Sequence, residues 1–378
     1  MHTASPPAAA TALVIGGGVA GMSAALSLSE AGTRVHLIDS DPDWKVYGAG
    51  ITITGPTLRV MRRLGILDRV LAEGWTADGL LVCDAQGAVI SEISTSAQAL
   101  QGLPGAGGIM RPTLHRLLAE RVRARDITVT LGVSVTSLEP GAPVRVTFSD
   151  GQEGSYDIAV GADGIFSQTR EMLFPGFGGP RYVGQICWRL MTARHPSITR
   201  RTYFLGGPMK VGMNPVSPDE MYMFLLEPRA EPERLADAEL PDRLAQLMAP
   251  YGGIIAEVRD GLGPDSRIVV RPLETIVLPD PWHCDGVVLI GDASHATTPQ
   301  LASGAGMAME DGVVLGECIA AAPDIGSALD AFMARRYDRC RLVVENSLRL
   351  GQLERTGATP LEQIHVVERA LERLNEAY

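Results

Sequence analysis

Glycines near the start of the chain have the spacing that holds a nucleotide phosphate. An apolar run, Leu13-Val14-Ile15, leads into Gly16-Gly17-Gly18-Val19-Ala20-Gly21, which shows the pattern G-x-G-x-x-G before a helical pattern. Gly16 would allow a tight turn, Gly18 would let the backbone approach a pyrophosphate, and Gly21 would let the helix pack closely on the sheet. The positive N-terminus of that helix would face the phosphates, which indicates a dinucleotide ligand.

An acidic residue follows at a position that suits an adenosine ribose. The apolar run 34–38 reads as a second strand and ends at Asp39, about 20 residues past the glycine loop, where a carboxylate accepts hydrogen bonds from the ribose. This position favours a free 2′-hydroxyl. Residues 8–28 are also apolar enough for a signal peptide or a membrane span, but glycines and serines interrupt them and no basic segment precedes them. The dinucleotide interpretation is therefore preferred.

A strand, a loop and a helix in the last third of the chain offer further contacts to a ligand. Val287-Val288-Leu289-Ile290 reads as a buried strand, and Asp292 would point from its carboxyl end, where open α/β sheets bind ligands and an acceptor can fix a polyol. Pro299 and the small residues Ser303-Gly304-Ala305-Gly306 would let the backbone approach a flat ring, and the helix from Met307 offers that ring a positive end. The alternative is an ordinary strand, loop and helix with a capping aspartate.

Two more segments complete the set. Tyr156-Asp157-Ile158-Ala159-Val160 reads as another buried strand, which is followed by Gly161-Ala162-Asp163-Gly164 and by Arg170. Asp163 and Arg170 could serve only as an ion pair that braces the turn and the next helix. The fourth segment is Gly108-Ile109-Met110-Arg111-Pro112-Thr113-Leu114.

The order and spacing of these four segments along most of the chain resemble the group A flavoprotein monooxygenases, the para-hydroxybenzoate hydroxylase family. The resemblance implies that the ligand is FAD. In that family the glycine loop and the acid at Asp39 hold the ADP half of FAD, Arg111 would lie by the ribityl and phosphate part, and Asp292 would hold a ribityl hydroxyl. The cofactor-binding residues that the resemblance implies are Gly16, Gly18, Ala20, Gly21, Asp39, Ser40, Gly50, Thr52, Arg111, Val135, Asp163, Asp292, Pro299, Gly304, Ala305, Gly306 and Met307.

The chemistry that the resemblance implies is oxidative. NAD(P)H would reduce FAD, the reduced flavin would take O₂ at C4a, and the flavin hydroperoxide would hydroxylate a small aromatic or heteroaromatic ring. The protein would polarise or deprotonate the substrate hydroxyl, exclude water and position the ring. No second glycine motif for NAD(P)H occurs in the sequence, which fits a family whose reductant binds transiently. Two alternatives stay open: epoxidation or Baeyer–Villiger oxygenation of a larger polycyclic natural product, and a non-oxygenating flavin-binding redox or partner protein.

Within the family, residues 204–222 look most like the branch that contains FAD-dependent urate hydroxylase and hydroxynicotinate hydroxylase. Lys210 falls where the urate enzyme has an arginine that touches substrate, and Tyr222 falls on its tyrosine, so both are candidate catalytic residues. Lysine replaces a planar bidentate group by a point charge, which argues against urate itself. The alternatives are a solvated lysine at a strand end and a core tyrosine with a satisfied hydroxyl.

Composition limits the class of protein. The chain has 378 residues, a net charge of −11 and a hydrophobic fraction of 46%, as expected for a soluble globular protein large enough for two domains. Its acidic balance argues against nucleic acid or an anionic membrane as a partner, so small molecules are the expected ligands. The resemblance implies that these are a small aromatic substrate and O₂, and we expect a monomer or homodimer. Five scattered cysteines, and histidines without ligand spacing, predict a cytoplasmic protein without metal. His295 is expected to be a hydrogen-bonded structural histidine.

The predicted fold class is α/β, with a discontinuous Rossmann-like FAD-binding domain, an inserted, mainly β substrate domain and C-terminal helices. We assign residues 1–75, 101–180 and 276–322 to the FAD-binding domain, 76–100 and 181–275 to the substrate domain, and 323–378 to the C-terminal helices. Residues 1–10 are expected to be disordered. Capping signals and periodicity predict hairpins around 86–87 and 149–151 and single helices at 58–70, 113–125, 239–248, 307–319, 328–354 and 361–375.

Overall fold

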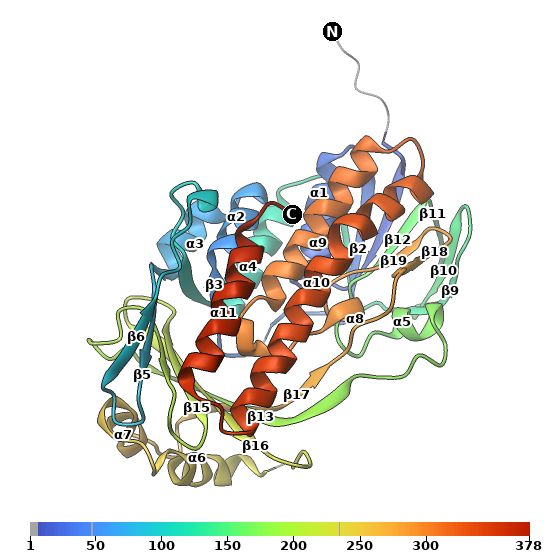
Figure 1. Ribbon diagram of the computed structural model, residues 1–378. Helices are drawn as coiled ribbons and strands as arrows, with labels where there is room; N and C mark the ends of the chain where they lie inside the picture. The colour runs from blue at the N-terminus through green and yellow to red at the C-terminus, as the bar shows by residue number, and fades with distance from the viewer. Residues whose placement is uncertain (1–6, 47, 234) are drawn as a thin grey trace.

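The computed structural model describes residues 7–46, 48–233 and 235–378, and it confirms the α/β class (Figure 1). Two large sheets form the body of the molecule, and two long helices at the C-terminal end of the chain run along both parts. Residues 1–6, which belong to the segment expected to be disordered, lie outside the described residues.

The first sheet has six strands in the order β18-β19-β12-β1-β2-β8, and all but β18 are parallel. Alternate residues of β1 face opposite layers: Ala12 and Val14 pack against helices, whereas Leu13 and Ile15 pack against a three-stranded antiparallel sheet, β11-β10-β9. Burial on both faces explains why these strands read as unbroken apolar runs. The strands are β1 (Thr11–Ile15), β2 (Arg34–Asp39), β8 (Thr128–Leu131), β9 (Val135–Glu139), β10 (Val144–Phe148), β11 (Glu153–Tyr156), β12 (Ile158–Gly161), β18 (His283–Cys284) and β19 (Val287–Leu289).

Helices α1 (Val19–Glu30), α4 (Arg111–Arg123) and α9 (Gly304–Ala321) lie over the helical face of this sheet. The closest contact joins α1 and α9, and it depends on two glycines of α9. A Cβ atom on Gly312 would lie 2.4 Å from the backbone nitrogen of Ala24, and one on Gly316 would lie 2.6 Å from Cβ of Ser27. The missing side chains let the two helices touch along their backbones, which brings the N-terminal glycine motif beside the third motif.

The second large sheet has seven strands in the order β17-β13-β16-β15-β14-β5-β6. Strands β5 and β6, which come from residues 80–93, therefore join strands from residues 181–275, and this supports the predicted discontinuous division, whose boundaries stay a prediction. Helices α6 (Leu240–Met248) and α7 (Gly253–Asp260) pack on its outer face. The strands are β5 (Leu80–Cys83), β6 (Val89–Ile93), β13 (Arg181–Ala193), β14 (Arg201–Phe204), β15 (Lys210–Pro215), β16 (Glu220–Pro228) and β17 (Arg267–Thr275).

A small antiparallel sheet, β3-β7-β4, lies between the two large sheets. Its strands are β3 (Gly50–Thr54), β7 (Ala106–Met110) and β4 (Trp75–Ala77). The single helix predicted over residues 58–70 is wrong, because the chain forms α2 (Gly55–Arg63) and α3 (Leu67–Glu73) with a break at Gly65. Gly65 has a φ of 71°, the left-handed conformation that ends a helix. The other predicted helices and both hairpins are present.

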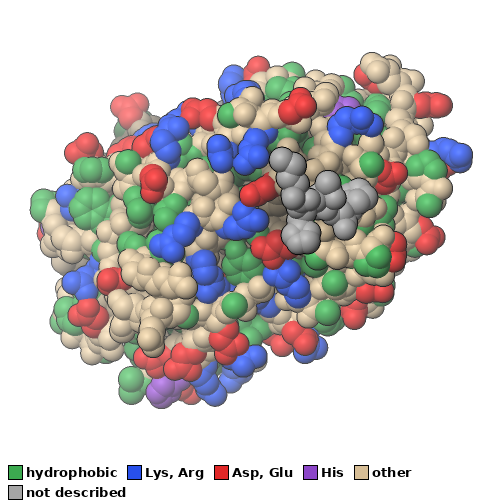
Figure 2. Space-filling model, turned by 90° about the horizontal axis from the view of Figure 1, so that it is seen from above, with side chains coloured by type: hydrophobic (Ala, Val, Ile, Leu, Met, Phe, Trp, Pro, Cys, Tyr) green, Lys and Arg blue, Asp and Glu red, His purple; other side chains and the backbone are tan. Residues whose placement is uncertain are grey.

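Neither a membrane-spanning helix nor, on the face drawn in Figure 2, a broad basic area is present among the described residues. No helix among the described residues is both long enough and apolar enough to cross a bilayer. On the face drawn in Figure 2, the described Lys and Arg side chains are interspersed with Asp and Glu side chains.

The C-terminal helices are α10 (Ile325–Arg355) and α11 (Pro360–Asn375), and α10 is long enough to contact both α9, which covers the six-stranded sheet, and β13 of the seven-stranded sheet. Each begins with a side-chain cap: Asp324 accepts a hydrogen bond from the backbone N–H of Ser327, and Thr359 accepts one from that of Glu362. Two buried polar clusters, one at the C-terminal end of α10 and one near its middle, fix the helix in place.

The first cluster lies where α10 meets the seven-stranded sheet. The Glu354 carboxylate accepts hydrogen bonds from Lys210 Nζ at 3.1 Å, Gln185 Nε2 at 3.1 Å and Gln300 Nε2 at 3.2 Å. The side chains of Lys210 and Glu354 are each only 4% exposed. The cluster therefore ties α10 to β13, to β15 and to the loop that follows Pro299.

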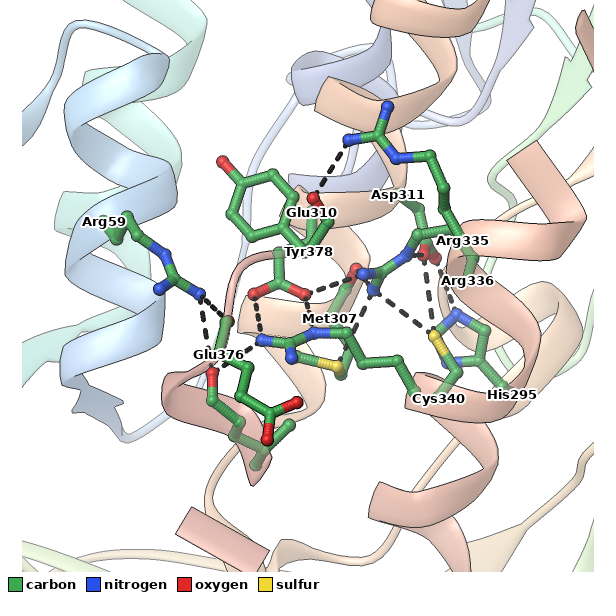
Figure 3. Close-up of polar contacts among 12 residues, drawn as sticks. Arg59, His295, Met307, Glu310, Asp311, Arg335, Arg336, Cys340, Glu376 and Tyr378 are labelled. Carbon is green, nitrogen blue, oxygen red and sulfur yellow. Dashed lines mark hydrogen bonds and ion pairs between the residues drawn. The ribbon is translucent and has the colours of Figure 1, made fainter. Parts of the chain in front are cut away.

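The second cluster centres on Asp311 of α9 (Figure 3). Its Oδ2 atom accepts hydrogen bonds from the backbone N–H of Gly291 at 2.8 Å and from His295 Nε2 at 2.6 Å, and its Oδ1 atom accepts one from Arg336 Nε at 2.7 Å. The Cys340 thiol lies 3.7 Å from Oδ1. One buried carboxylate thus joins the turn after β19 to α9 and α10, and His295 is the structural histidine that was predicted.

The charges of this cluster stabilise each other. Burial alone would raise the pKa of Asp311, but the positive charges of His295 and Arg336 lower it to about 2. Burial alone would lower the pKa of His295, but its interactions with Cys340 and Asp311 raise it well above its usual value. Ligand atoms of His295, Asp311 and Cys340 lie within 4.8 Å of one another. Because N–H donors already occupy both oxygens of Asp311, we interpret the cluster as an ionic network rather than a metal site.

We expect Glu354→Ala to destabilise the fold by about 3–5 kcal/mol, because the substitution leaves the Lys210 ammonium buried without its partner. Urea unfolding measures this loss. Glu220→Ala serves as the matched control, since Glu220 pairs with Arg267 at the surface and its loss should cost no more than about 1 kcal/mol. Equal effects of the two substitutions would contradict the role assigned to the buried pair.

We expect the free energy of unfolding to fall as the pH rises from about 6.5 towards the raised pKa of His295. The folded state holds the His295 proton over that interval while the unfolded state releases it, so the stabilisation is complete below the unfolded pKa and is lost above the folded one. The His295→Gln protein should show a flatter stability profile over this interval. Parallel profiles for the two proteins, measured by urea unfolding from pH 6 to 9, would show that His295 is not the titrating group.

Candidate functional site

A cavity of about 440 Å³ opens between the two large sheets. The glycine loop after β1, the turn after β19 and the loop before α9 line one side of it. Strands β13, β14, β16 and β17 line the other side. The small sheet contributes Thr52 of β3. The cavity is therefore where the FAD-binding and substrate parts that were predicted from the sequence meet.

Ten of the residues predicted to form the site line this cavity. They are Gly18, Ala20, Gly50, Thr52, Arg111, Tyr222, Asp292, Pro299, Gly304 and Ala305. The others do not line it, and their predicted ligand contacts stay predictions. They are Gly16, Gly21, Asp39, Ser40, Val135, Asp163, Lys210, Gly306 and Met307.

Contacts on the side away from the cavity hold the glycine loop in place, and its other side faces the cavity. Gly16 has a φ of 106°, and a Cβ atom on Gly21 would lie 1.8 Å from the carbonyl oxygen of Gly16. On the far side, Asp39 Oδ2 accepts a hydrogen bond from the backbone N–H of Gly17 at 2.6 Å, and Trp44 donates one to the Gly17 carbonyl at 2.9 Å. Around Gly18, in contrast, a Cβ atom would meet nothing within 4 Å.

Arg111 and Asp292 are ionisable side chains of the cavity that form no hydrogen bond or close ion pair with any described residue. Arg111 and Asp292 are both exposed to the cavity, yet protein atoms surround them closely. Burial and the charge of Arg189 lower the pKa of Arg111, although Asp292 raises it. Burial raises the pKa of Asp292, against the opposing charges of His295 and Arg111. An unpaired donor group and an unpaired acceptor group in one buried cavity are suited to a polar ligand.

The middle motif braces the turn that carries Asp292. Asp163 does not pair with Arg170; it accepts hydrogen bonds from Ser167 Oγ at 2.5 Å and from the backbone N–H of Thr169 at 2.9 Å, at the start of α5 (Gln168–Leu173). Arg170 donates instead to the backbone carbonyl of Ala293 at 3.1 Å. The ion-pair alternative is therefore wrong, because Arg170 joins the middle motif to the third motif.

The loop before α9 presents a helix N-terminus to the cavity. Pro299, Gly304 and Ala305 line it, and α9 begins at Gly304 without a side chain that caps its first N–H groups. Gly306 and Met307 are buried behind them, and a Cβ atom on Gly306 would lie 2.3 Å from Thr57 Oγ1. The close packing on α2 therefore holds the positive end of α9 at the cavity.

The opposite side of the cavity carries three aromatic rings. Tyr222 and Phe224 of β16 point to the same face of the sheet because they lie two residues apart. Their ring centroids are 6.3 Å apart, and the ring of Tyr203 on β14 meets Phe224 edge-on at 5.7 Å. Gly212 lies between Tyr203 and Phe224 in the sheet and leaves room for both rings. We call Tyr203, Tyr222 and Phe224 the aromatic wall.

The Tyr222 hydroxyl belongs to a buried three-residue network. Asn214 Nδ2 donates to Tyr222 Oη at 2.8 Å and to Thr52 Oγ1 at 2.7 Å, and the two hydroxyls bond each other. Since one hydroxyl proton is used between the two oxygens, the other stays free to donate into the cavity. Burial raises the pKa of Tyr222, although its hydrogen bonds to Thr52 and Asn214 oppose this rise, so the phenol is a donor rather than a base.

Lys210 and Val135 lie away from the cavity. Glu354 holds the Lys210 ammonium 4.4 Å from the centroid of Tyr203, behind the aromatic wall. Val135 is buried in the core between β9 and the six-stranded sheet, and Ser40 is exposed after β2. The predicted substrate contact of Lys210 therefore has no support from the cavity.

Sequence reasoning missed Tyr203 and Phe224 of the aromatic wall and further cavity residues on β13 and β17. Cys187 and Arg189 lie two residues apart on β13 and so share one face of the strand, and Arg271 and Glu274 come from β17. The alternation of β13 could have indicated one face, but it could not show which face meets a ligand. Pairing with β16 decides that, since Arg189 lies opposite Phe224.

Comparison with known proteins connects this geometry to a family. Residues 9–347 match the family model described as the FAD binding domain. The chain is 32% identical over 349 residues to 2-heptyl-3-hydroxy-4(1H)-quinolone synthase of Pseudomonas aeruginosa, with 91% of this chain and 89% of that protein covered. It is 31% identical over 347 residues to FAD-dependent urate hydroxylase of Klebsiella oxytoca, with 88% and 87% covered.

A solved structure shares the whole architecture. The complex of Klebsiella pneumoniae HpxO with FAD and uric acid superposes with a TM-score of 0.83 at 26% identity and covers 97% of this chain and 93% of that one. The family match spans most of the chain and includes all four motifs that form the cavity. The chain therefore belongs to the FAD-binding-domain family and is a FAD-dependent monooxygenase.

Proposed function

We propose that this monooxygenase uses NAD(P)H and O₂ to hydroxylate a small aromatic or heteroaromatic substrate. The observation that carries the proposal is the cavity itself, in which Arg111 and Asp292 lie across from the aromatic wall. The relatives support the substrate class, since two of them are named for urate and for a quinolone, which are heteroaromatic rings.

The residues on the first side of the cavity fit FAD. The open space at Gly18 suits a pyrophosphate, and the unpaired Asp292 and Arg111 suit the ribityl hydroxyls and the phosphates. The uncapped N-terminus of α9 suits the electron-rich edge of a flavin ring. When bound there, FAD supplies the redox chemistry, taking electrons from NAD(P)H and activating O₂.

The protein side chains then serve the substrate. Phe224 and Tyr203 offer ring faces and edges that hold a flat molecule, and they keep water from the space in front of the cofactor. The free proton of the Tyr222 and Thr52 pair can donate a hydrogen bond to a hydroxyl or carbonyl oxygen of the ring. Such a bond orients the substrate ring in front of the cofactor.

The size of the cavity favours a small ring over the larger polycyclic alternative. Pockets for small molecules range over about 300–1,000 Å³, and this cavity, at about 440 Å³, must also admit the flavin ring. The non-oxygenating alternative would leave the aromatic wall and its free hydroxyl proton without a purpose. We further propose a cytoplasmic enzyme that acts as a monomer or homodimer.

Reductant oxidation tests this proposal directly. Purified protein is loaded with FAD, and NADH or NADPH oxidation is followed with and without phenols, hydroxypyridines, purines and polycyclic phenols. We expect flavin absorbance bands, oxidation stimulated by one class of small ring and a hydroxylated product. Stimulation by polycyclic compounds alone, or bound flavin without any stimulation, would overturn the proposed substrate class.

A substitution at Gly18 separates cofactor binding from folding. Gly18→Ala should leave the stability of the FAD-free protein unchanged or slightly higher, because its Cβ atom meets no protein atom and its φ of −75° suits alanine. The affinity for FAD should fall at least about tenfold, since the new methyl group occupies the space of the pyrophosphate. Flavin fluorescence titration measures the affinity.

Gly263→Ala is the matched control for this substitution. A Cβ atom there also meets nothing within 4 Å, but the residue lies outside the cavity, so FAD affinity should not change. Tight FAD binding by Gly18→Ala would show that the pyrophosphate does not pass this glycine.

A further inference from the structure

The cavity contains more positive charge than the cofactor explains. Arg111, Arg189 and Arg271 line it, and none of them forms an ion pair with an acidic side chain among the described residues. Asp292 and Glu274 are the acidic residues of its lining. When Arg111 and Asp292 are assigned to FAD, two arginines and one glutamate remain on the substrate side.

Arg189 lies next to the aromatic wall. It is opposite Phe224 in the pairing of β13 with β16, and it points to the same face as Cys187, which lies two residues before it and also lines the cavity. Its guanidinium makes no hydrogen bond to any described residue. A flat ligand that packs on Phe224 therefore meets a free planar donor at its edge.

Arg271 stands on the neighbouring strand. Its register position is opposite Cys187, and its guanidinium donates only to the adjacent backbone carbonyl of Val270, at 2.9 Å. It is more exposed than Arg189, so it belongs to the rim of the cavity rather than to its depth. The two arginines extend along one face from the rim towards the aromatic wall.

The guanidinium groups of Arg111 and Arg189 repel each other, and a bound anion would reduce this repulsion. Burial and the charge of Arg189 lower the pKa of Arg111, while Asp292 raises it, so the repulsion between the two guanidinium groups is only partly compensated. Three arginines and two acidic residues line the cavity, and the one positive charge left over favours a bound anion. A carboxylate matches the planar fork of arginine with two parallel hydrogen bonds.

The cation predicted from the sequence cannot take this role. Lys210 is bound to Glu354 and lies outside the cavity lining, so its charge is already neutralised within the protein. The positive charge that faces the substrate comes instead from β13.

We propose that Arg189, assisted by Arg271, binds the carboxylate of an aromatic or heteroaromatic acid and so selects acids over their neutral analogues. This inference rests on the proposed function and deepens it by naming the substrate class. The carboxylate would lie at the edge of a ring that packs on Phe224, while the Tyr222 and Thr52 pair contacts another oxygen of the same ring.

Matched pairs of acids and primary carboxamides test the proposal in the FAD-loaded protein. Hydroxybenzoates, hydroxypyridinecarboxylates and hydroxyquinolinecarboxylates are titrated against their amides, and the change in flavin absorbance reports binding without turnover. For at least one pair we expect the acid to bind at least about tenfold more tightly than the amide. Arg189→Met should abolish that preference by weakening acid binding much more than amide binding, and Arg189→Lys should restore part of it.

Arg267→Met provides the control on β17, since Arg267 pairs with Glu220 at the surface and lies outside the cavity lining. It should keep the full preference for the acid. Arg271→Met should reduce the preference less than Arg189→Met does.

Each contrary result has a distinct meaning. Equal binding of acids and amides by the unaltered protein, absence of binding by either series, or an unchanged preference in Arg189→Met would overturn the carboxylate proposal. FAD binding and substrate-stimulated NAD(P)H oxidation by neutral rings would, in those cases, leave the proposed function standing. A protein that binds no FAD would overturn both the carboxylate proposal and the proposed function.

Discussion

The Asp311 carboxylate is the contact on which the cofactor side of the molecule depends. It holds the backbone of Gly291 at the end of β19, and through His295 and Arg336 it fixes the same turn to α9 and α10. Asp292, which faces the cavity, is the next residue along this turn. A carboxylate buried so deeply is stable only with several donors. The donors that satisfy it therefore also determine where Asp292 points.

The cavity forms because segments far apart in the sequence are brought to one place by close backbone packing. Gly312 and Gly316 let α9 touch α1. The loop that precedes α9 therefore lies beside the glycine loop that precedes α1. Arg170 adds the middle motif by donating to the Ala293 carbonyl. The aromatic wall comes from a different sheet with its own core. The residues predicted to hold the cofactor and the rings of the aromatic wall thus belong to separate layers, which meet at the cavity.

Local signals predicted the cofactor side well and the substrate side poorly. The cavity positions of Gly18 and Asp292 follow from short motifs in which a strand, a turn and a helix are adjacent in sequence. The cavity position of Arg189 depends on the pairing of β13 with β16. The position of Lys210 outside the cavity depends on its bond to Glu354, which lies 144 residues further along the chain. No local pattern encodes such contacts. The break at Gly65 was missed because the apolar spacing continues across it.

Helix α10 also joins the cofactor side of the molecule to the seven-stranded sheet. One of its buried clusters holds the cofactor turn through Arg336, and the other holds the seven-stranded sheet through Glu354. The two parts that chain connectivity separates therefore share one helix whose polar side chains are satisfied only when both parts are folded. Loss of either part would leave buried charges on α10 without partners. The two parts therefore stabilise each other through this one helix, and neither keeps its buried ion pairs without the other.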